Sequence, residues 1–342
     1  MGTDADPFAG LVGKAIAGAI PGATGIANLK RLSGGANKET WSFDVRCDGA
    51  QGKNGLLPLV LRRAPRGVDV GRSNLLSLER EAAVVQAAAG AGLPAPRVRY
   101  VLQPDDGLGH GFFMDRIEGE TLARRILRDE AFAAARPLLA GQCGAILARL
   151  HRLTASAVPG LRVAPILTEL GNVRTLYRSY RHPHPVFALA FRWLAERAPA
   201  YAQTDLVLVH GDFRHGNLII GPEGVRAVLD WEGAHIGDPM EDLAWISVNS
   251  WRFGNIDQPV GGFGQREDLF AGYEAAGGRT VDRDRVRFWE VYGTLRWGIG
   301  CMGMYATFAS GADRSVERAA IGRRASETEI DLLALITGKG WA

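Results

Sequence analysis

The chain has 342 residues, of which 46% are hydrophobic and 23% charged, and its formal net charge at pH 7 is +3. This length is enough to bury two hydrophobic cores, so a protein of two lobes is expected. The small net charge gives no reason to expect nucleic acid or a membrane surface as a partner, and no uncharged apolar stretch is long enough to span a membrane. Cys47, Cys143 and Cys301 lack disulfide or metal-ligand spacing, which is typical of a protein of the reducing cytoplasm.

The N-terminal part is expected to form a small sheet with two helices. A helix is predicted over residues 7–20 and strands over 26–32 and 40–45, because apolar residues recur first at helical and then at alternating spacing. Between these strands stand Ser33, Gly34, Gly35, Ala36 and Asn37. A loop of such small residues lets backbone amides approach phosphate groups, which makes it a candidate for nucleotide binding. An ordinary hairpin turn is the alternative.

A third strand, a long helix and two further strands complete this part. The expected elements are a strand over residues 59–63, a helix over 74–89 and strands over 97–102 and 111–117. The last strand runs into Met114, Asp115, Arg116 and Ile117, where the chain leaves the sheet. An N-lobe of residues 1–116 is therefore predicted.

From residue 117 onward the pattern is mainly helical. Helices are expected over residues 137–153, 166–180, 186–196, 242–248, 264–276, 283–308 and 316–337. The predicted fold class is therefore α+β, with a small β-rich N-lobe and a larger, mainly helical C-lobe over residues 117–342. The helix over 283–308 is crowded with aromatic residues such as Trp297. Core packing explains this crowding, and a substrate pocket lined together with Trp251 is the alternative.

The stretch from Val207 to Ala244 carries the most chemistry. An apolar strand leads into His210-Gly211-Asp212, and Asn217 directly precedes a second strand. A third strand, after a turn, runs into Asp230-Trp231-Glu232. Asp212, Asn217 and Asp230 therefore stand at strand ends or in adjoining loops, where their side chains can converge.

These three residue types are the ones that phosphoryl transfer requires. A carboxylate must orient and deprotonate the attacking hydroxyl, while an amide oxygen and a second carboxylate hold magnesium ions. Four residues separate Asp212 from Asn217, which is the gap found in the catalytic loop of protein kinases. His210 stands where that loop has its histidine.

On this motif the chain resembles the aminoglycoside phosphotransferase and choline kinase-like superfamily, relatives of protein kinases that phosphorylate hydroxyls of small molecules. The resemblance implies a two-lobed kinase-like fold, with ATP, or alternatively GTP, as phosphoryl donor and Mg²⁺ as cofactor. It implies that Asp212 is the catalytic base and that His210 fixes the catalytic loop. Asn217 and Asp230 would be the magnesium ligands. For Glu232, contact with a metal-bound water and a structural role both stay open.

The same resemblance implies nucleotide-binding roles in the N-lobe. In kinase-like folds a lysine of the third strand contacts the phosphates and pairs with a glutamate of the following helix. Arg62 and Glu81 are the expected pair here, with Arg63 as the alternative cation, so an arginine replaces the usual lysine. The segment from Met114 to Ile117 is the expected hinge, whose backbone would contact the adenine.

Other functions and the acceptor stay open at this stage. A nucleotide-binding pseudokinase scaffold is favoured by the arginine at position 62, and a metallohydrolase would use His210, Asp212, His215 and His235. The basic helix containing Arg314, Arg318, Arg323 and Arg324 argues against a polycationic aminoglycoside. An amino alcohol, an anionic hydroxylated metabolite and a hydroxyacyl-CoA remain as acceptors. The protein is expected to be a monomer or a homodimer.

Overall fold

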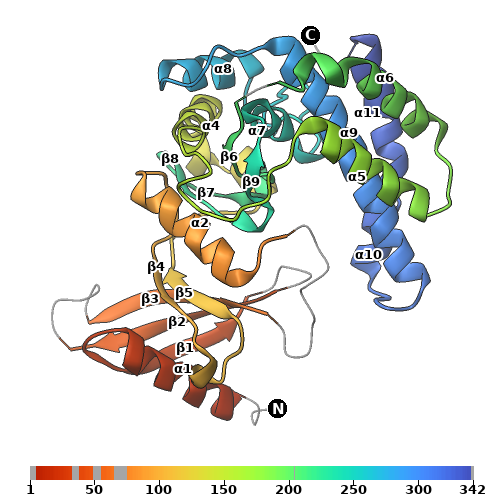
Figure 1. The fold of residues 1–342 in the computed structure, drawn as a ribbon. Helices are drawn as coiled ribbons and strands as arrows, with labels where there is room; N and C mark the ends of the chain where they lie inside the picture. The colour runs from red at the N-terminus through yellow and green to blue at the C-terminus, as the bar shows by residue number, and fades with distance from the viewer. Residues whose placement is uncertain (1–4, 33–37, 49–54, 65–74, 204, 340–342) are drawn as a thin grey trace. The chain divides into compact units, whose positions relative to one another are not determined.

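The computed structural model describes residues 5–32, 38–48, 55–64, 75–203 and 205–339. The chain divides into two compact units, one of Met1–Gly119 with Arg226–Ala234 and one of Glu120–Val225 with His235–Ala342 (Figure 1). The predicted α+β class is confirmed, with the sheet in the first unit and most helices in the second. The sequence predicted an N-lobe of residues 1–116. In the structure, residues 226–234 also belong to the first unit. No helix of the described residues is long and apolar enough to cross a membrane.

The first unit is built on an antiparallel sheet of five strands in the order β1-β2-β3-β5-β4. The strands are β1 (Ala23–Arg31), β2 (Glu39–Cys47), β3 (Leu56–Arg63), β4 (Val98–Val101) and β5 (Gly111–Asp115), with the helices α1 (Ala5–Ala19) and α2 (Leu78–Gly90) and a short 3-10 turn, η1 (Pro104–Asp106). Phe43 and Val45 of β2 and Leu59 of β3 are fully buried in one apolar cluster with Val12 and Ile16 of α1. Since side chains alternate along a strand, the even-numbered positions of β2 and β3 point to the other face.

The register of β2 and β3 decides which polar residues share that other face. Thr40 of β2 is directly opposite Arg62 of β3. Directly opposed residues lie on one face of a sheet, and so do residues two apart on a strand. The side chain of Arg62 therefore points away from α1.

Ser77 caps the start of α2, where its Oγ accepts a hydrogen bond from the amide of Arg80 at 3.4 Å.

The second unit is mainly helical. Its helices are α3 (Ala123–Arg128), α4 (Arg136–Leu150), α5 (Ile166–Ser179), α6 (Pro185–Tyr201), α7 (Pro239–Trp245), α8 (Arg266–Ala275), α9 (Arg283–Ala309), α10 (Val316–Gly322) and α11 (Ala325–Thr337). Short 3-10 turns are η2 (Glu130–Phe132), η3 (His215–Asn217) and η5 (Asn249–Trp251), and η4 (Trp231–Gly233) belongs to the first unit. The strands are β6 (Val207–Val209), β7 (Leu218–Gly221) and β9 (His235–Gly237), and along β8 (Gly224–Val228) the chain passes into the first unit.

The single helix expected over residues 316–337 is wrong, because the structure has two helices there, α10 and α11. Gly322 ends α10 in close contact with α9, where an added Cβ would lie 2.8 Å from Cβ of Tyr305. Only glycine permits this approach. Helical periodicity in the sequence does not report the break between the two helices.

Helices α4 and α8 cross at glycines. A Cβ added at Gly144 of α4 would overlap the carbonyl oxygen of Leu269 in α8 and lie 2.6 Å from the amide nitrogen of Tyr273. Both neighbouring atoms belong to the backbone, so a change of side-chain rotamer could not relieve these clashes. The close crossing of these two helices therefore depends on the absence of a side chain at position 144.

Gly144→Ala is expected to lower the free energy of unfolding by about 1–3 kcal/mol or more, because the added methyl group forces α4 and α8 apart. Gly171→Ala is the matched control, since Gly171 is exposed in α5 with no atom near the added Cβ. This control should raise stability by up to about 1 kcal/mol through helix propensity. Urea unfolding followed by tryptophan fluorescence measures both variants. Equal shifts in the two variants would contradict the packing argument.

Candidate active site

The turn after β6 carries the predicted catalytic residues of the second unit. All three residues of β6 are buried, and Val207 and Val209 pair with Gly237 and His235 of β9. Gly211 has φ of 74°, a conformation that glycine adopts without steric cost. The chain therefore turns sharply at Gly211 and presents Asp212 directly after a rigid strand.

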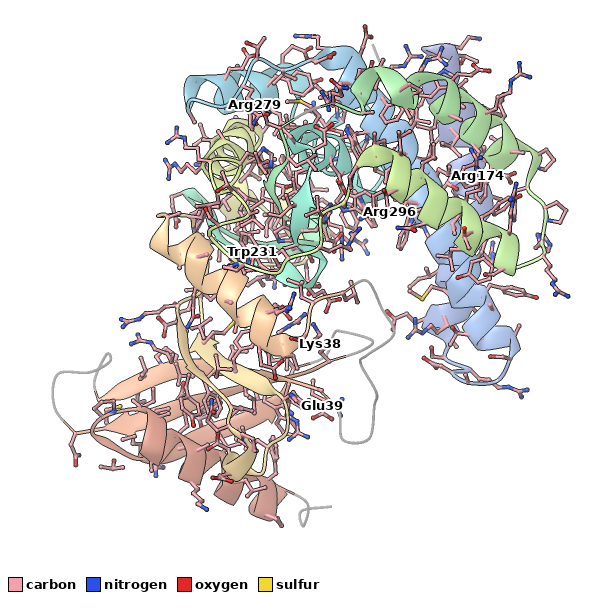
Figure 2. The ribbon with its side chains drawn as sticks, viewed as in Figure 1. Lys38, Glu39, Arg174, Trp231, Arg279 and Arg296 are labelled. Carbon is pink, nitrogen blue, oxygen red and sulfur yellow. The ribbon has the colours of Figure 1, made fainter. Side chains whose placement is uncertain are left out.

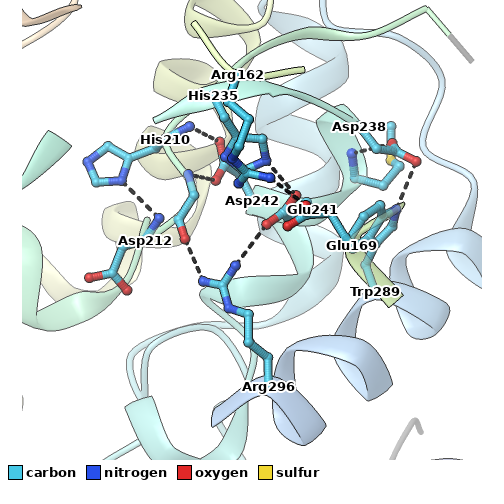
Figure 3. A network of polar contacts seen from close by, with 12 residues as sticks. Arg162, Glu169, His210, Asp212, His235, Asp238, Glu241, Asp242, Trp289 and Arg296 are labelled. Atoms are coloured by element: carbon cyan, nitrogen blue, oxygen red, sulfur yellow. Dashed lines mark hydrogen bonds and ion pairs between the residues drawn. The ribbon is translucent and has the colours of Figure 1, made fainter. Parts of the chain in front are cut away.

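A buried carboxylate fixes this turn. Asp242 of α7 is fully buried, and its side chain accepts hydrogen bonds from the amides of His210 at 2.7 Å and Gly211 at 2.9 Å (Figure 3). Its Oδ2 also lies 3.2 Å from Nε2 of His151. Burial raises the pKa of Asp242, but the hydrogen bond and charge of His151 and those of His210 outweigh burial and leave the pKa lowered. Asp242 thus stays charged and holds the catalytic turn by its backbone.

The carboxylate of Asp212 is held by donors on both oxygens. Trp245 Nε1 donates to Oδ1 at 2.7 Å, and Asn217 Nδ2 donates to Oδ2 at 2.7 Å. The guanidinium of Arg214 also approaches, with Nε 3.2 Å from Oδ1. The side chain nevertheless stays 28% exposed, so a substrate can reach it. This arrangement suits a carboxylate that must be oriented and still accessible, which is what a general base requires.

Asn217 is placed by the short turn η3. Its Nδ2 also donates to the main-chain carbonyl of Asp212 at 2.9 Å, so both donated bonds go to Asp212. Because both bonds are made by the nitrogen, the amide oxygen of Asn217 has no hydrogen-bond partner among the described residues. An amide oxygen is a suitable magnesium ligand.

Arg296 of α9 holds the catalytic turn from another direction. Its Nη2 donates to the carbonyl oxygen of Gly211 at 2.7 Å, and its Nη1 lies 3.2 Å from Glu241 (Figure 3). The guanidinium also lies 4.2 Å above the ring of Trp245. Arg296 therefore links α9 to the turn and to the tryptophan that contacts Asp212.

Three tryptophans form a cluster beside Asp212. The rings of Trp245 and Trp251 are 5.4 Å apart, and those of Trp251 and Trp297 are 4.8 Å apart. Arg214 lies 4.8 Å above Trp251. Within the described part of the chain, the buried indole nitrogens of Trp251 and Trp297 have no hydrogen-bond partner. The sequence singled out Trp251 and Trp297 but missed Trp245, although Asp242 and Trp245 are three apart on one helix and so share a face.

The first unit contains a separate charged cluster, made of Lys38, Arg62, Glu81, Asp230 and Glu232. Arg62 Nε lies 2.8 Å from Glu81, and its Nη2 lies 2.5 Å from Asp230 and 3.1 Å from Glu232. The Lys38 ammonium lies 2.8 Å from Glu81 and 2.7 Å from Glu232. Burial lowers the pKa of Arg62, but the three carboxylates outweigh burial and raise it. The expected partner of Glu81 is thus Arg62, and sequence analysis missed Lys38.

The alternative cation, Arg63, has other contacts. Its Nε lies 3.3 Å from Glu39, and its guanidinium lies 5.1 Å above the ring of Phe8 in α1. Arg63 therefore belongs to the face of the sheet that α1 covers, opposite to Arg62.

The donor set of this cluster fits a hard divalent cation. Asp230 has φ of 63°, which non-glycine residues seldom adopt and which is often found at functional sites. Burial and the charge of Asp230 raise the pKa of Glu232, so the two carboxylates crowd each other. A cation such as Mg²⁺ binds one or two carboxylates together with substrate phosphates. Among the described residues there is no group of three or more His, Cys, Asp or Glu side chains arranged for a metal.

Three further predictions concern the small-residue loop, the hinge segment and the convergence of Asp212, Asn217 and Asp230. Residues Ser33 to Asn37 lie outside the described residues. In the hinge segment, the amides of Asp115 and Arg116 donate hydrogen bonds to the carbonyl oxygens of Arg97 and Pro58. These two amides are therefore not free to bind adenine, and the predicted contact would use Ile117 or the carbonyl groups of the segment. Asp212 and Asn217 belong to the second unit and Asp230 to the first, so their convergence stays a prediction.

The histidines of the metallohydrolase alternative have separate partners. His215 Nδ1 lies 2.6 Å from the carbonyl oxygen of Gly261, and His235 Nε2 lies 3.2 Å from Glu241. His210 Nδ1 accepts a hydrogen bond from the amide of Asp212 at 3.2 Å. Each ring is thus used to fix local structure, which is the loop-fixing role that the resemblance implies for His210.

The fold is that of kinase-like phosphotransferases, and a profile of the phosphotransferase enzyme family matches residues 28–289. Because this match covers most of the chain, the protein belongs to the phosphotransferase enzyme family. Members of this family are small-molecule phosphotransferases. The predicted resemblance is confirmed.

Two curated relatives are much longer than the matching segment. The chain is 30% identical over 205 residues to mouse acyl-CoA dehydrogenase family member 10, a match that covers 55% of this chain and 18% of that protein. It is 28% identical over 211 residues to human acyl-CoA dehydrogenase family member 11, covering 57% and 26%. The chain therefore corresponds to about a quarter or less of the length of these relatives.

Solved structures show the same fold across nearly the whole chain. A Ralstonia eutropha protein with a provisional assignment as an aminoglycoside phosphotransferase has a TM-score of 0.70 at 19% identity, covering 97% of this chain and 96% of that one. A choline/ethanolamine kinase family protein from Mesorhizobium loti has a TM-score of 0.62 at 19% identity, covering 98% and 97%. Aminoglycoside phosphotransferase APH(4)-Ia, in complex with AMP-PNP and hygromycin B, has a TM-score of 0.59 at 19% identity, covering 91% and 94%.

The neutral His215 beside the catalytic residues predicts a pH dependence of stability. Burial lowers the pKa of His215 to about 4, and the charge of Arg214 adds to this effect. The unfolded chain binds a proton at this residue below about pH 6.5, while the folded protein does not until about pH 4. The free energy of unfolding should therefore fall as pH drops from 6.5 to 4, by up to about 1.4 kcal/mol per pH unit from this residue.

His215→Asn tests this assignment, because asparagine keeps a donor for Gly261 but does not titrate. Urea unfolding at several pH values should show a smaller decline for the variant than for the wild type between pH 6.5 and 4. Above pH 7 the difference between the two proteins should be constant. Parallel curves across the whole range would show that His215 is not the responsible group.

Proposed function

We propose that this protein transfers the γ-phosphoryl group of ATP to a hydroxyl group of a small molecule. The observation that carries this proposal is the Asp212 carboxylate, which Trp245 and Asn217 hold by hydrogen bonds while it stays accessible. Membership of the phosphotransferase enzyme family supports it, as does the AMP-PNP in the related APH(4)-Ia complex.

In the proposed reaction, the acceptor oxygen attacks the γ-phosphorus, the bond from that phosphorus to the β,γ-bridging oxygen breaks, and ADP leaves. Asp212 orients the hydroxyl and takes its proton. His210 and Asp242 keep the turn in place, so that the base is positioned before substrate binds. Arg296 holds the carbonyl group of Gly211 at the same turn.

Magnesium is proposed as the cofactor. In the first unit Asp230 and Glu232 are the proposed ligands, and in the second unit Asn217 is. When bound, Mg²⁺ neutralises charge on the phosphate groups. Arg62 is proposed to keep Asp230 and Glu232 in place, since its guanidinium contacts both carboxylates. GTP as an alternative donor, a cytoplasmic location, and a monomer or homodimer stay predictions.

The surroundings of Asp212 favour an uncharged or anionic acceptor over a polyammonium one. Arg214 contacts the Asp212 carboxylate, Arg296 contacts the carbonyl group of Gly211, and Trp251 adds an aromatic surface. A pocket of about 450 Å³ in the second unit is lined mainly by apolar groups, with Arg323, His182 and His184 among its lining residues. Met302 of this pocket is six residues beyond Arg296 on α9, about 9 Å along the helix. A hydroxylated compound with an apolar body fits this description.

A nucleotide-binding protein without turnover is the competing function, because Arg62 stands where the related kinases have lysine. This alternative and the enzyme differ in a single measurable property. Both predict that ATP with magnesium raises the melting temperature, but only the enzyme consumes ATP in the presence of an acceptor.

Asp212→Ala is expected to abolish phosphoryl transfer, because it removes the carboxylate that is proposed to take the proton of the acceptor. A screen of amino alcohols, hydroxylated acids, hydroxyacyl-CoAs and aminoglycosides with ATP and magnesium, read out by ADP formation, identifies the acceptor. The variant should lose at least about a hundredfold in rate, while its thermal shift with ATP and magnesium stays as in the wild type. Asp268→Ala, which changes an exposed carboxylate of α8, is the control. Unchanged turnover in Asp212→Ala would remove Asp212 from this role.

A further inference from the structure

The charged cluster of the first unit contains a lysine that the third strand does not supply. Lys38 stands immediately before β2, and Figure 2 marks it beside Glu39. Thr40 is opposite Arg62, so Lys38, two residues before Thr40, points to the same face of the sheet as Arg62. Glu39 points to the other face, where it pairs with Arg63.

Lys38 makes the ion pair that is expected of a phosphate-binding lysine. Its ammonium is 2.8 Å from Oε2 of Glu81, a buried glutamate of α2, and the lysine side chain itself is only 4% exposed. Arg62 takes the other oxygen of Glu81. One glutamate therefore orients two cations, one from the residue just before β2 and one from β3.

Both cations contact more than one carboxylate. The Nε and Nη2 of Arg62 lie within 3.1 Å of three carboxylates, those of Glu81, Asp230 and Glu232. Lys38 has three N–H donors and contacts two carboxylates, those of Glu81 and Glu232. Among the described residues, one N–H of Lys38 has no carboxylate contact and can reach a ligand, and Nη1 of Arg62 has no carboxylate contact either. The cluster has more carboxylates than cations, so a buried ammonium here is stable before any nucleotide binds.

We propose that Lys38 is the lysine that binds the nucleotide phosphates in this protein, so that the role usually held by a lysine of the third strand has moved to the start of the second. Arg62, at the usual position, instead holds Asp230 and Glu232. This inference rests on the proposed function. It removes the main argument for a protein without turnover, since the cluster does contain a lysine paired with the helix glutamate.

The chemistry of the two side chains agrees with this division. An ammonium group is a compact charge on a flexible stem and can turn one N–H toward a phosphate oxygen while keeping two carboxylate contacts. A guanidinium is a planar fork that suits several carboxylates at once. Lys38 also follows directly on Ser33 to Asn37, the sequence segment with the small residues expected near phosphates.

Nucleotide affinity of a lysine variant is the first test. Lys38→Met should weaken binding of ADP with magnesium by about tenfold to a hundredfold, the effect of losing one charge-assisted contact. Binding of adenosine, which has no phosphate, should change by less than about twofold. Lys30→Met, a change on β1 of the same sheet, is the matched control and should leave both affinities unchanged. Isothermal titration measures them. Equal losses for ADP and adenosine, or none for either, would overturn the assignment of Lys38.

Moving the lysine back to the third strand is the second test. In Lys38→Met with Arg62→Lys, the new lysine stands opposite Thr40 and beside Glu81, so it should restore at least part of the affinity for ADP. Failure of this double variant to bind better than Lys38→Met would count against a shared role of the two positions. Urea unfolding of each variant shows whether it is folded.

Labelling of the wild-type protein gives a measurement that no variant can confound. An acyl-phosphate derivative of ATP transfers its acyl group to a nearby lysine amine, forming an amide and releasing ATP. Lys38 should be the main labelled residue among the five lysines of the chain, and excess ADP should protect it. Labelling at other lysines only would refute the inference. If the wild type binds no ATP at all, the proposed function fails, whereas ATP binding that does not depend on Lys38 refutes only this inference.

Discussion

The turn that carries the predicted base depends on one buried charge, the carboxylate of Asp242. A buried carboxylate is costly unless several donors surround it, and here the amides of His210 and Gly211 and the ring of His151 do so. The same contacts that stabilise the charge also fix the backbone just before Asp212. The hydrogen bonds of Asp242 therefore both stabilise the turn and position Asp212. Helix α7 carries Asp242 and also Trp245, which orients the Asp212 side chain.

The charged groups of the two units differ in kind. The cluster of the first unit has more carboxylates than cations, which suits a divalent cation and the nucleotide phosphates that accompany it. Around Asp212 the second unit has arginines and indole groups instead. In the proposed function, the first unit would bind the phosphoryl donor and the second would present the base to the acceptor.

The sequence alone predicted much of the fold. Periodicity located nearly all strands and helices, because apolar alternation and helical spacing reflect which face of each element is buried. It predicted one helix where the structure has α10 and α11, and it did not predict α3 or β9. The motif residues were found by their spacing, which reflects chain geometry within one loop. Their orientation by Trp245 and Arg296 was not found, because these contacts join distant parts of the sequence.

By itself, the sequence determined the class of the protein, and it predicted the catalytic loop and favoured Arg62 over Arg63 as the partner of Glu81, since each depends on residue type and local spacing. Only the tertiary structure decided that Lys38 joins that pair, because the register of β2 against β3 sets which side chains share a face. It also decided that Asp230 and Glu232 belong with the sheet, although 110 or more residues separate them from it along the chain. Burial and register are long-range properties, and no local pattern of residues encodes them.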